Sequence, residues 1–149
     1  MKKRWVLLPV CLFMSGCVMN APSMNKKMAA SDALAVSITA IAMDQAKDFD
    51  STRVKVIEIA TELRKFVDTG NFSDLPSKDA ERVLIGHLAS KGWSSYSYIV
   101  DSALAYVKTK NVNVDKIGVN NVELIKIALD GVIRQATRGK SEWAVSLLK

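Results

Sequence analysis

Residues 52–68 read TRVKVIEIATELRKFVD and carry the clearest helical pattern in the chain. Apolar side chains recur there every three or four positions, which places them on one stripe of a helix. The charged side chains lie largely off that stripe. The stretch therefore predicts an amphipathic helix whose buried face consists of Val56, Ile59, Ala60, Leu63, Phe66 and Val67.

The same period recurs from Ala29 onward and predicts helices over about 31–47, 77–91, 94–110 and 120–138, with a short last helix from Ser141. Each predicted helix has an apolar face that we expect to be buried. The faces are Leu34, Ile38, Ile41 and Gln45; Ala80, Val83, Leu84, His87 and Leu88; Tyr96, Ile99, Val100, Ala103, Leu104 and Val107; Val122, Ile125, Ala128, Leu129, Val132, Ile133 and Ala136; and Trp143, Ala144, Leu147 and Leu148.

Glycines and a capping pattern predict where several helices end and begin. Gly70 stands where a helix needs a left-handed residue to stop, and Gly92 ends the next helix. Asn120 with Glu123 three residues later is typical of a capping box. Residues 111–119 alternate apolar and polar side chains as a short strand does. A lone strand has nothing to pair with, so an apolar loop over the bundle is favoured.

These elements predict an all-α fold, a single bundle of five or six amphipathic helices over residues 31–149. No repeat period relates the helices, which argues against a solenoid. Their unequal spacing argues against a single coiled coil, which needs sustained heptads.

The first 16 residues have the order of a secretory signal peptide. Lys2, Lys3 and Arg4 precede an apolar run from Trp5 to Met14, and the small residues Ser15 and Gly16 follow. The run is about half the roughly 20 residues that span a membrane as a helix, so removal of the leader is favoured over a permanent anchor.

Residues Met14-Ser15-Gly16-Cys17 resemble the lipobox of bacterial lipoproteins. The resemblance implies cleavage between Gly16 and Cys17 and a covalent lipid, with acyl chains such as palmitate, on Cys17. Met14 stands where that family most often has Leu. Cys11 is the competing position, but Val10 before it is too bulky for such a cut. Two or more acyl chains hold a protein on a membrane essentially permanently.

The lipoprotein resemblance also implies a location. Val18 follows the cysteine, where Asp resembles an inner-membrane retention signal, so we expect the periplasmic face of the outer membrane if the host is Gram-negative. Residues 17–30 have little periodicity and predict a flexible tether, in which Lys26 and Lys27 either contact anionic headgroups or are simply solvated.

The composition after the leader excludes several classes of function. Without Lys2, Lys3 and Arg4 the chain keeps 18 of its 21 basic residues against 15 acidic ones, a net charge of +3. They form no cluster, which argues against a nucleic-acid partner. With Cys17 as the sole remaining cysteine, neither a disulfide nor a cysteine metal site is expected within one copy.

Catalytic patterns are sparse, and we expect no catalytic residues, no metal and no cofactor beyond the lipid. His87 lies beside a predicted buried stripe and is expected to be structural, with a pH-responsive contact as the alternative. Ser146 and Lys149 have the Ser-x-x-Lys spacing of penicillin-recognising enzymes without its companion motifs. The five glutamates after the leader are expected to be solvated: Glu58, Glu62, Glu81, Glu123 and Glu142.

The segment from Gly92 to Tyr98 is the one candidate surface. Trp93, Tyr96 and Tyr98 alternate with hydroxyl side chains and are suited to stacking on a sugar or on a partner chain. The alternative is that Ser94 or Ser95 caps a helix while Trp93 and Tyr96 pack inward. Tyr98 lies off the apolar stripe and is expected to be exposed.

Two classes of function are consistent with this sequence. The first is a membrane-anchored, non-enzymatic interaction protein of the cell envelope: a pilot, an assembly accessory or an exclusion factor for a membrane machine, with an envelope protein as its partner. The second is a module that binds or modifies the cell wall. Fold alone does not separate them, and the sequence predicts no oligomeric state.

Overall fold

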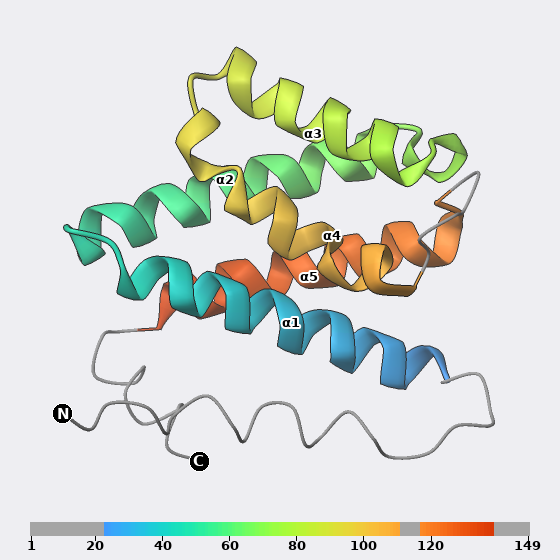
Figure 1. The fold of residues 1–149 in the computed structure, drawn as a ribbon, viewed down its shortest axis with the longest axis horizontal. Helices are drawn as coiled ribbons and strands as arrows, with labels where there is room; N and C mark the ends of the chain where they lie inside the picture. The colour runs from blue at the N-terminus through green and yellow to red at the C-terminus, as the bar shows by residue number, and fades with distance from the viewer. Residues whose placement is uncertain (1–22, 111–116, 139–149) are drawn as a thin grey trace, which may run out of the picture.

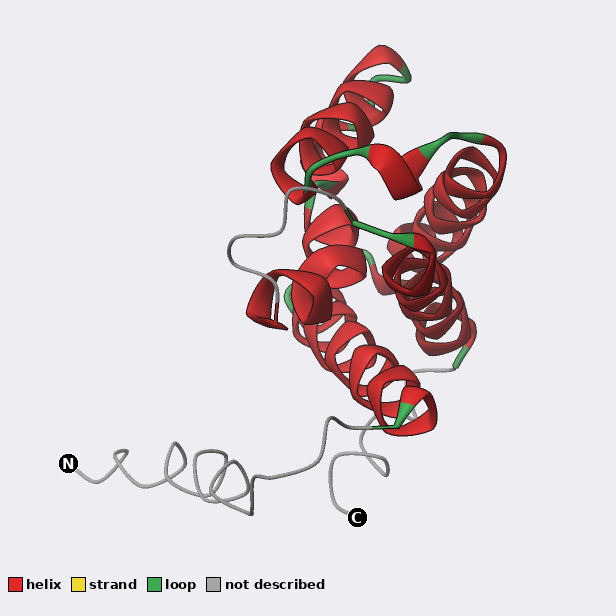
Figure 2. Cartoon of the chain, turned by 90° about the vertical axis from the view of Figure 1, so that its right-hand side faces the viewer, coloured by secondary structure: helices red, strands yellow, loops and turns green. Residues whose placement is uncertain are grey.

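The computed structural model describes residues 23–110 and 117–138, and within these ranges the chain forms five α-helices and no strand (Figures 1 and 2). The helices are α1 (Met24–Asp44), α2 (Phe49–Thr69), α3 (Ser77–Ser90), α4 (Tyr98–Lys110) and α5 (Val119–Thr137). Two short 3-10 helices, η1 (Phe72–Asp74) and η2 (Ser94–Tyr96), precede α3 and α4. The all-α bundle is confirmed. The predicted helix from Ser141 lies outside the described residues.

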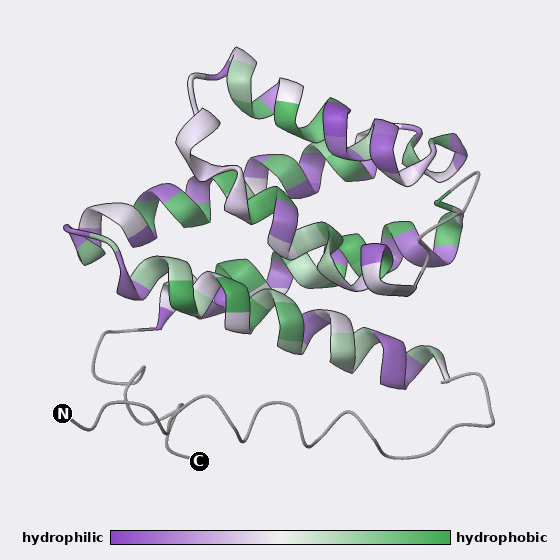
Figure 3. Ribbon diagram, viewed as in Figure 1, coloured by the Kyte–Doolittle hydropathy of each residue, from purple (hydrophilic) through white to green (hydrophobic). Residues whose placement is uncertain are grey.

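Helix α5 forms the centre of the bundle because it packs against α1, α2 and α4 at once. In Figure 1 it lies behind α1 and α4, whereas α3 lies at the outer edge. Hydrophobic and hydrophilic residues alternate along the helices (Figure 3), as amphipathic helices require. The side chains of α5 buried by its three neighbours include Leu124, Ile125, Ala128, Leu129, Val132, Gln135 and Ala136.

Helix α2 has the buried face that its sequence predicts. Its buried residues are Val56, Ile59, Ala60, Leu63 and Val67, and Phe66 packs partly buried against the same core. The helix begins three residues before the predicted Thr52, because the Asp48 side chain caps it by accepting a hydrogen bond from the Ser51 backbone N–H.

The prediction for α1 was wrong at its start and only partly right in its buried face, in which Leu34 packs partly buried against the core. The helix begins at Met24, so residues 24–30, predicted to belong to the tether, are helical. Ile41 is 63% exposed. Alanine covers much of this helix, so apolar periodicity does not distinguish its faces. The residues that α1 buries are Ser31, Ala35, Thr39, Ala40 and Met43.

Small residues bring α1 close to α5. The Ser31 hydroxyl donates a 2.9 Å hydrogen bond to the Leu124 carbonyl. Gly131 faces Asp32, and a Cβ at Gly131 would collide with the Asp32 carboxylate. That carboxylate pairs with Arg134 one turn further along α5. The interface therefore depends on close approach of the two backbones rather than on large side chains.

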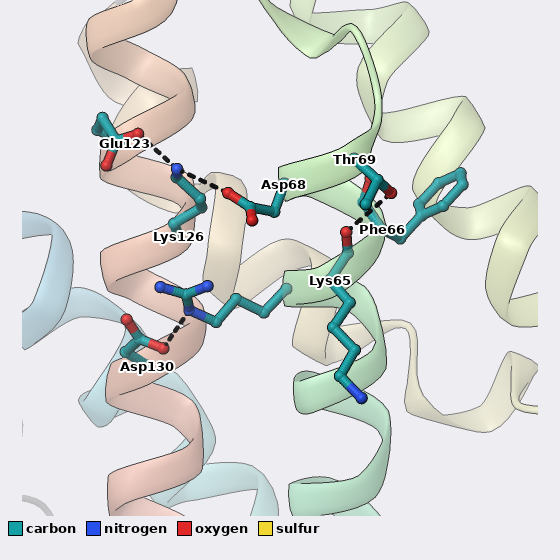
Figure 4. Close-up of polar contacts among 8 residues, drawn as sticks. Lys65, Phe66, Asp68, Thr69, Glu123, Lys126 and Asp130 are labelled. Carbon is teal, nitrogen blue, oxygen red and sulfur yellow. Dashed lines mark hydrogen bonds and ion pairs between the residues drawn. The ribbon is translucent and has the colours of Figure 1, made fainter.

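Ion pairs join α2 to α5 along the opposite side of α5 (Figure 4). The Arg64 Nε donates to an Asp130 oxygen at 2.6 Å, and the Lys126 Nζ contacts Asp68 at 3.1 Å. Lys126 also pairs with Glu123 on its own helix. The Lys126 ammonium donates hydrogen bonds to Glu123 and to Asp68, and these raise its pKa, with Glu123 making the larger contribution, because both carboxylates stabilise the charged form.

The start of α5 differs from the start that the sequence predicts. The capping box at Asn120 is wrong, because α5 begins at Val119 after Gly118, and no side chain caps it. The connection before α5 is instead held by the N–H of Ile117, which donates to the Leu75 carbonyl at 2.8 Å. Ile117 is buried, and residues 111–116, for which a loop or strand was considered, lie outside the described ranges.

Gly70 ends α2 for a reason other than the one predicted. Its φ is −85°, which any residue adopts, so a left-handed conformation does not explain it. The ring of Phe72 lies against Gly70, and a Cβ there would come within 2.6 Å of a ring carbon. Gly92 does have the left-handed conformation, with φ of +73°.

We expect Gly70→Ala to lower the free energy of unfolding by about 1–3 kcal/mol, because the Phe72 ring or the backbone must move. Gly86→Ala is the matched control, since nothing lies within 4 Å of a Cβ at that position in the middle of α3. It should stabilise the protein by about 0.5–1 kcal/mol. Urea unfolding of both variants measures the difference, and equal effects would contradict the role of the ring.

Candidate functional site

The turn between α3 and α4 places Trp93 beside two lysines. Gly92 adopts the left-handed conformation, and the Trp93 N–H donates to the Leu88 carbonyl at 2.8 Å, a Schellman-type helix end. The indole packs partly buried against the core. The Nζ atoms of Lys55 and Lys91 lie over its ring at 5.0 and 6.0 Å from the centroid, within cation–π range.

Of the two lysines, Lys91 links Trp93 to His87 through a glutamate, whereas Lys55 pairs with Glu58. The Lys91 Nζ lies 3.4 Å from a carboxylate oxygen of Glu62, and the His87 Nε2 lies 3.7 Å from that same oxygen. The His87 ring stacks on Phe66, with 4.1 Å between centroids and 10° between planes. We call Lys55, Glu62, His87, Lys91 and Trp93 the α2–α3 cluster. The cluster brings together His87 and Trp93, which the sequence analysis treats as separate candidates.

Trp93, Tyr96 and Tyr98 do not form a row of exposed aromatic rings. Tyr96 packs partly buried against the core, as the inward alternative for the segment predicts. Its ring lies 6.1 Å from that of Tyr98. Ser94 and Ser95 begin η2, and no side-chain cap forms at its start.

The prediction that Tyr98 is exposed was wrong. Tyr98 packs partly buried against the core, and its hydroxyl is buried with no hydrogen-bond partner among the described residues. The cause is that α4 is covered on several sides, by α1, α5 and α3. Positions off the expected stripe, such as Ser102 and Tyr106, are therefore buried too. Burial, with a smaller contribution from Tyr96, raises the pKa of Tyr98 to about 12.

We expect Tyr98→Phe to raise the free energy of unfolding by up to about 1 kcal/mol near pH 7, because it removes a buried hydroxyl without a partner. The pKa of Tyr98 in the folded protein lies above the ordinary tyrosine value of 10.0. Between about pH 10 and about pH 12 the folded protein therefore keeps this proton while the unfolded chain loses it. The free energy of unfolding of the wild type falls over that range.

Urea unfolding of the wild type and Tyr98→Phe between pH 8 and pH 11.5 measures both effects. The wild type should lose stability more steeply above pH 10 than the variant does. A variant that is less stable than the wild type at pH 7 would show that the hydroxyl has a partner.

The described glutamates are all engaged by lysines rather than free in solvent. Glu58 pairs with Lys55, Glu62 with Lys91, Glu81 with Lys108 and Glu123 with Lys126. Within residues 23–110 and 117–138, no group of three or more His, Cys, Asp or Glu side chains is arranged to hold a metal ion. Glu142, Ser146 and Lys149 lie outside these ranges.

No protein-family model, curated protein or solved structure matches this chain. None of the helices described above is long and apolar enough to cross a membrane. Gly16 and Cys17 lie outside the described residues, so the lipid site remains a prediction from sequence. Sequence reasoning missed Lys55 as a neighbour of Trp93, because 38 residues separate them and no local spacing reveals the contact. Lys91 is close to Trp93 in the sequence, but its contact with the ring depends on the turn at Gly92.

Proposed function

We propose that this protein is a lipid-anchored, non-enzymatic interaction protein of the bacterial cell envelope, a pilot, assembly accessory or exclusion factor for a membrane machine. The observation that carries the proposal is Ser15-Gly16-Cys17 at the end of a signal-like leader. A lipid on Cys17 supplies the membrane partner, and the bundle supplies a surface for an envelope protein. We expect the outer membrane, on its periplasmic face, in a Gram-negative host.

The length of chain between Cys17 and the bundle supports this arrangement. Helix α1 begins at Met24, seven residues after Cys17, so at most about 25 Å of chain separates the lipid from the first turn. The anchor therefore holds the start of α1 close to the bilayer. This distance is shorter than the tether of residues 17–30 that the sequence predicts.

The turn between α3 and α4 lies at the other end of the bundle from the start of α1. In Figure 1 α1 begins at the right, whereas the turn that joins α3 to α4, with Trp93, lies at the left. A bundle anchored through the start of α1 presents this turn away from its point of attachment. In this position the turn can contact an envelope protein that extends away from the membrane surface.

Trp93 fits a protein partner better than a sugar. One side of the indole packs on the core, and the ammonium groups of Lys55 and Lys91 lie over the ring. A sugar ring must displace both groups before it stacks, whereas a protein partner can contact the exposed lysine and indole edges together. The cell-wall alternative is therefore the weaker one.

The test places a photo-crosslinking residue at Ser95, which is exposed beside Trp93, and at Lys65, an exposed control on α2. Irradiated membranes should yield a discrete protein adduct from position 95 and none from position 65. Lys55→Ala should weaken the adduct without unfolding the bundle, because the contacts of the Lys55 ammonium are with Glu58 and Trp93 rather than with the buried core. Adducts that contain only cell-wall glycan, or equal adducts from both positions, would reject the proposal in favour of the cell-wall module.

A further inference from the structure

Helix α3 is the outermost helix of the bundle, and few side chains hold it in place. It lies at the edge of the molecule and packs mainly against α4 and η2. It buries Ala80, Leu84 and Leu88, while Val83 and Ile85 are each 39% exposed. A helix that buries so few side chains is expected to open more easily than the helices of the core.

The side chain of His87 contacts α2. Its ring lies flat on Phe66 of α2, and its side chain is only 17% exposed. The Nε2 atom is buried and has no hydrogen-bond partner among the described residues. The nearest acceptor is the Glu62 carboxylate, at 3.7 Å, which is too long for a hydrogen bond.

Glu62 and Lys91 are the charged groups that the contacts tie to His87, whereas those on neighbouring stretches of α2, α3 and α4 are paired with one another. Glu62 belongs to α2, and Lys91, from the turn after α3, lies 3.4 Å from the same Glu62 oxygen. On the α4 side, Lys108 pairs with Glu81 of α3. Further along α2, Lys55 pairs with Glu58 near Trp93. Glu62 is therefore the one carboxylate among them within reach of His87, and Lys91 competes for it.

We propose that His87 is a proton-operated latch that fixes α3 to α2. In the neutral ring, Nε2 is buried without a partner. Protonation makes both ring nitrogens donors, so Nε2–H can draw the Glu62 carboxylate into a charge-assisted hydrogen bond. The charged ring also lies on the face of Phe66, which favours a cation. Lys91, 45% exposed, turns toward solvent and Trp93.

The direction of the effect follows from these contacts. Histidine is the side chain that normally changes charge between pH 5 and pH 8. The Glu62 carboxylate and the face of Phe66 both favour a protonated ring over a neutral one, so the latch is expected to be closed at low pH. Acidification therefore tightens α3, and the proposal does not depend on the lipid anchor.

Hydrogen exchange of the purified full chain, read by mass spectrometry and corrected for intrinsic exchange, tests the latch. From pH 7.5 to pH 5.5, protection of residues 77–90 should rise about tenfold in the wild type. His87→Phe, which keeps an aromatic ring on Phe66, and Glu62→Gln should both lose this rise. Lys91→Met removes the competing cation and should keep it.

Each variant has an outcome that contradicts the latch. A tenfold rise that persists in Glu62→Gln would show that the carboxylate is not the partner. A rise that persists in His87→Phe would assign it to another group. A wild type whose α3 protection is constant or falls on acidification would overturn the proposal outright. If His87→Phe does not fold, Glu62→Gln alone decides, because Glu62 lies at the surface and its replacement leaves the stacked rings in place.

Discussion

Cys17→Ala is expected to move essentially all of the protein from the membrane fraction to the soluble fraction or to leave it as an unprocessed precursor. A free N-terminal segment without acyl chains has no strong hold on a bilayer, whereas each buried CH₂ of an acyl chain contributes about 0.8 kcal/mol. Fractionation, with labelling of the wild type by a fatty acid, measures both retention and modification.

The chain contains its own matched control in Cys11. Cys11→Ala changes a residue of the leader that the proposed cleavage removes, so retention and labelling should equal those of the wild type. Retention of Cys17→Ala on the membrane without fatty-acid label would instead identify the leader as an uncleaved anchor. If fatty-acid label is lost in Cys11→Ala and kept in Cys17→Ala, the lipid is on Cys11 and the proposed site at Cys17 is wrong.

Leu129→Ala is expected to have the largest effect on folding, a loss of about 3–4 kcal/mol in the free energy of unfolding. Leu129 is 0% exposed on α5, the helix that packs against three others. Because side chains from several helices surround it, no single backbone can move in to fill the cavity. Urea denaturation followed by circular dichroism measures the loss.

Val54→Ala is the control for this substitution. Val54 is 61% exposed on α2, so its replacement should change the free energy of unfolding by less than about 0.5 kcal/mol. Similar losses for the two variants would contradict the central position of α5. A loss near 2 kcal/mol or less for Leu129→Ala would show that the neighbouring helices relax into the space.

The parts of the fold that were predictable are those whose helices contrast apolar and charged faces. In α2, charged residues such as Lys65 separate the apolar positions so that only one stripe is left for the core. In α1, alanines occupy both exposed and buried positions. The apolar period therefore predicted a buried Ile41, which is exposed, and did not single out Ala35, which is buried. Hydrophobicity places a helix face only when the opposite face is polar.

The candidate site was predictable only in part, because it is made by contacts between helices. The Trp93 segment and His87 were both identifiable as unusual residues. Their connection through Glu62 and Lys91 depends on how α3 lies against α2, and nothing in the local sequence specifies that. Tyr98 was misplaced for the same reason, since its burial comes from helices distant in sequence.

The central position of α5 has a consequence for how the chain is made. Helix α5 is the last of the five described helices along the sequence, yet α1, α2 and α4 all bury their faces on it. While the chain emerges from the ribosome, the earlier helices therefore lack the partner that completes their core. The core is therefore complete only once residues 119–137 have emerged.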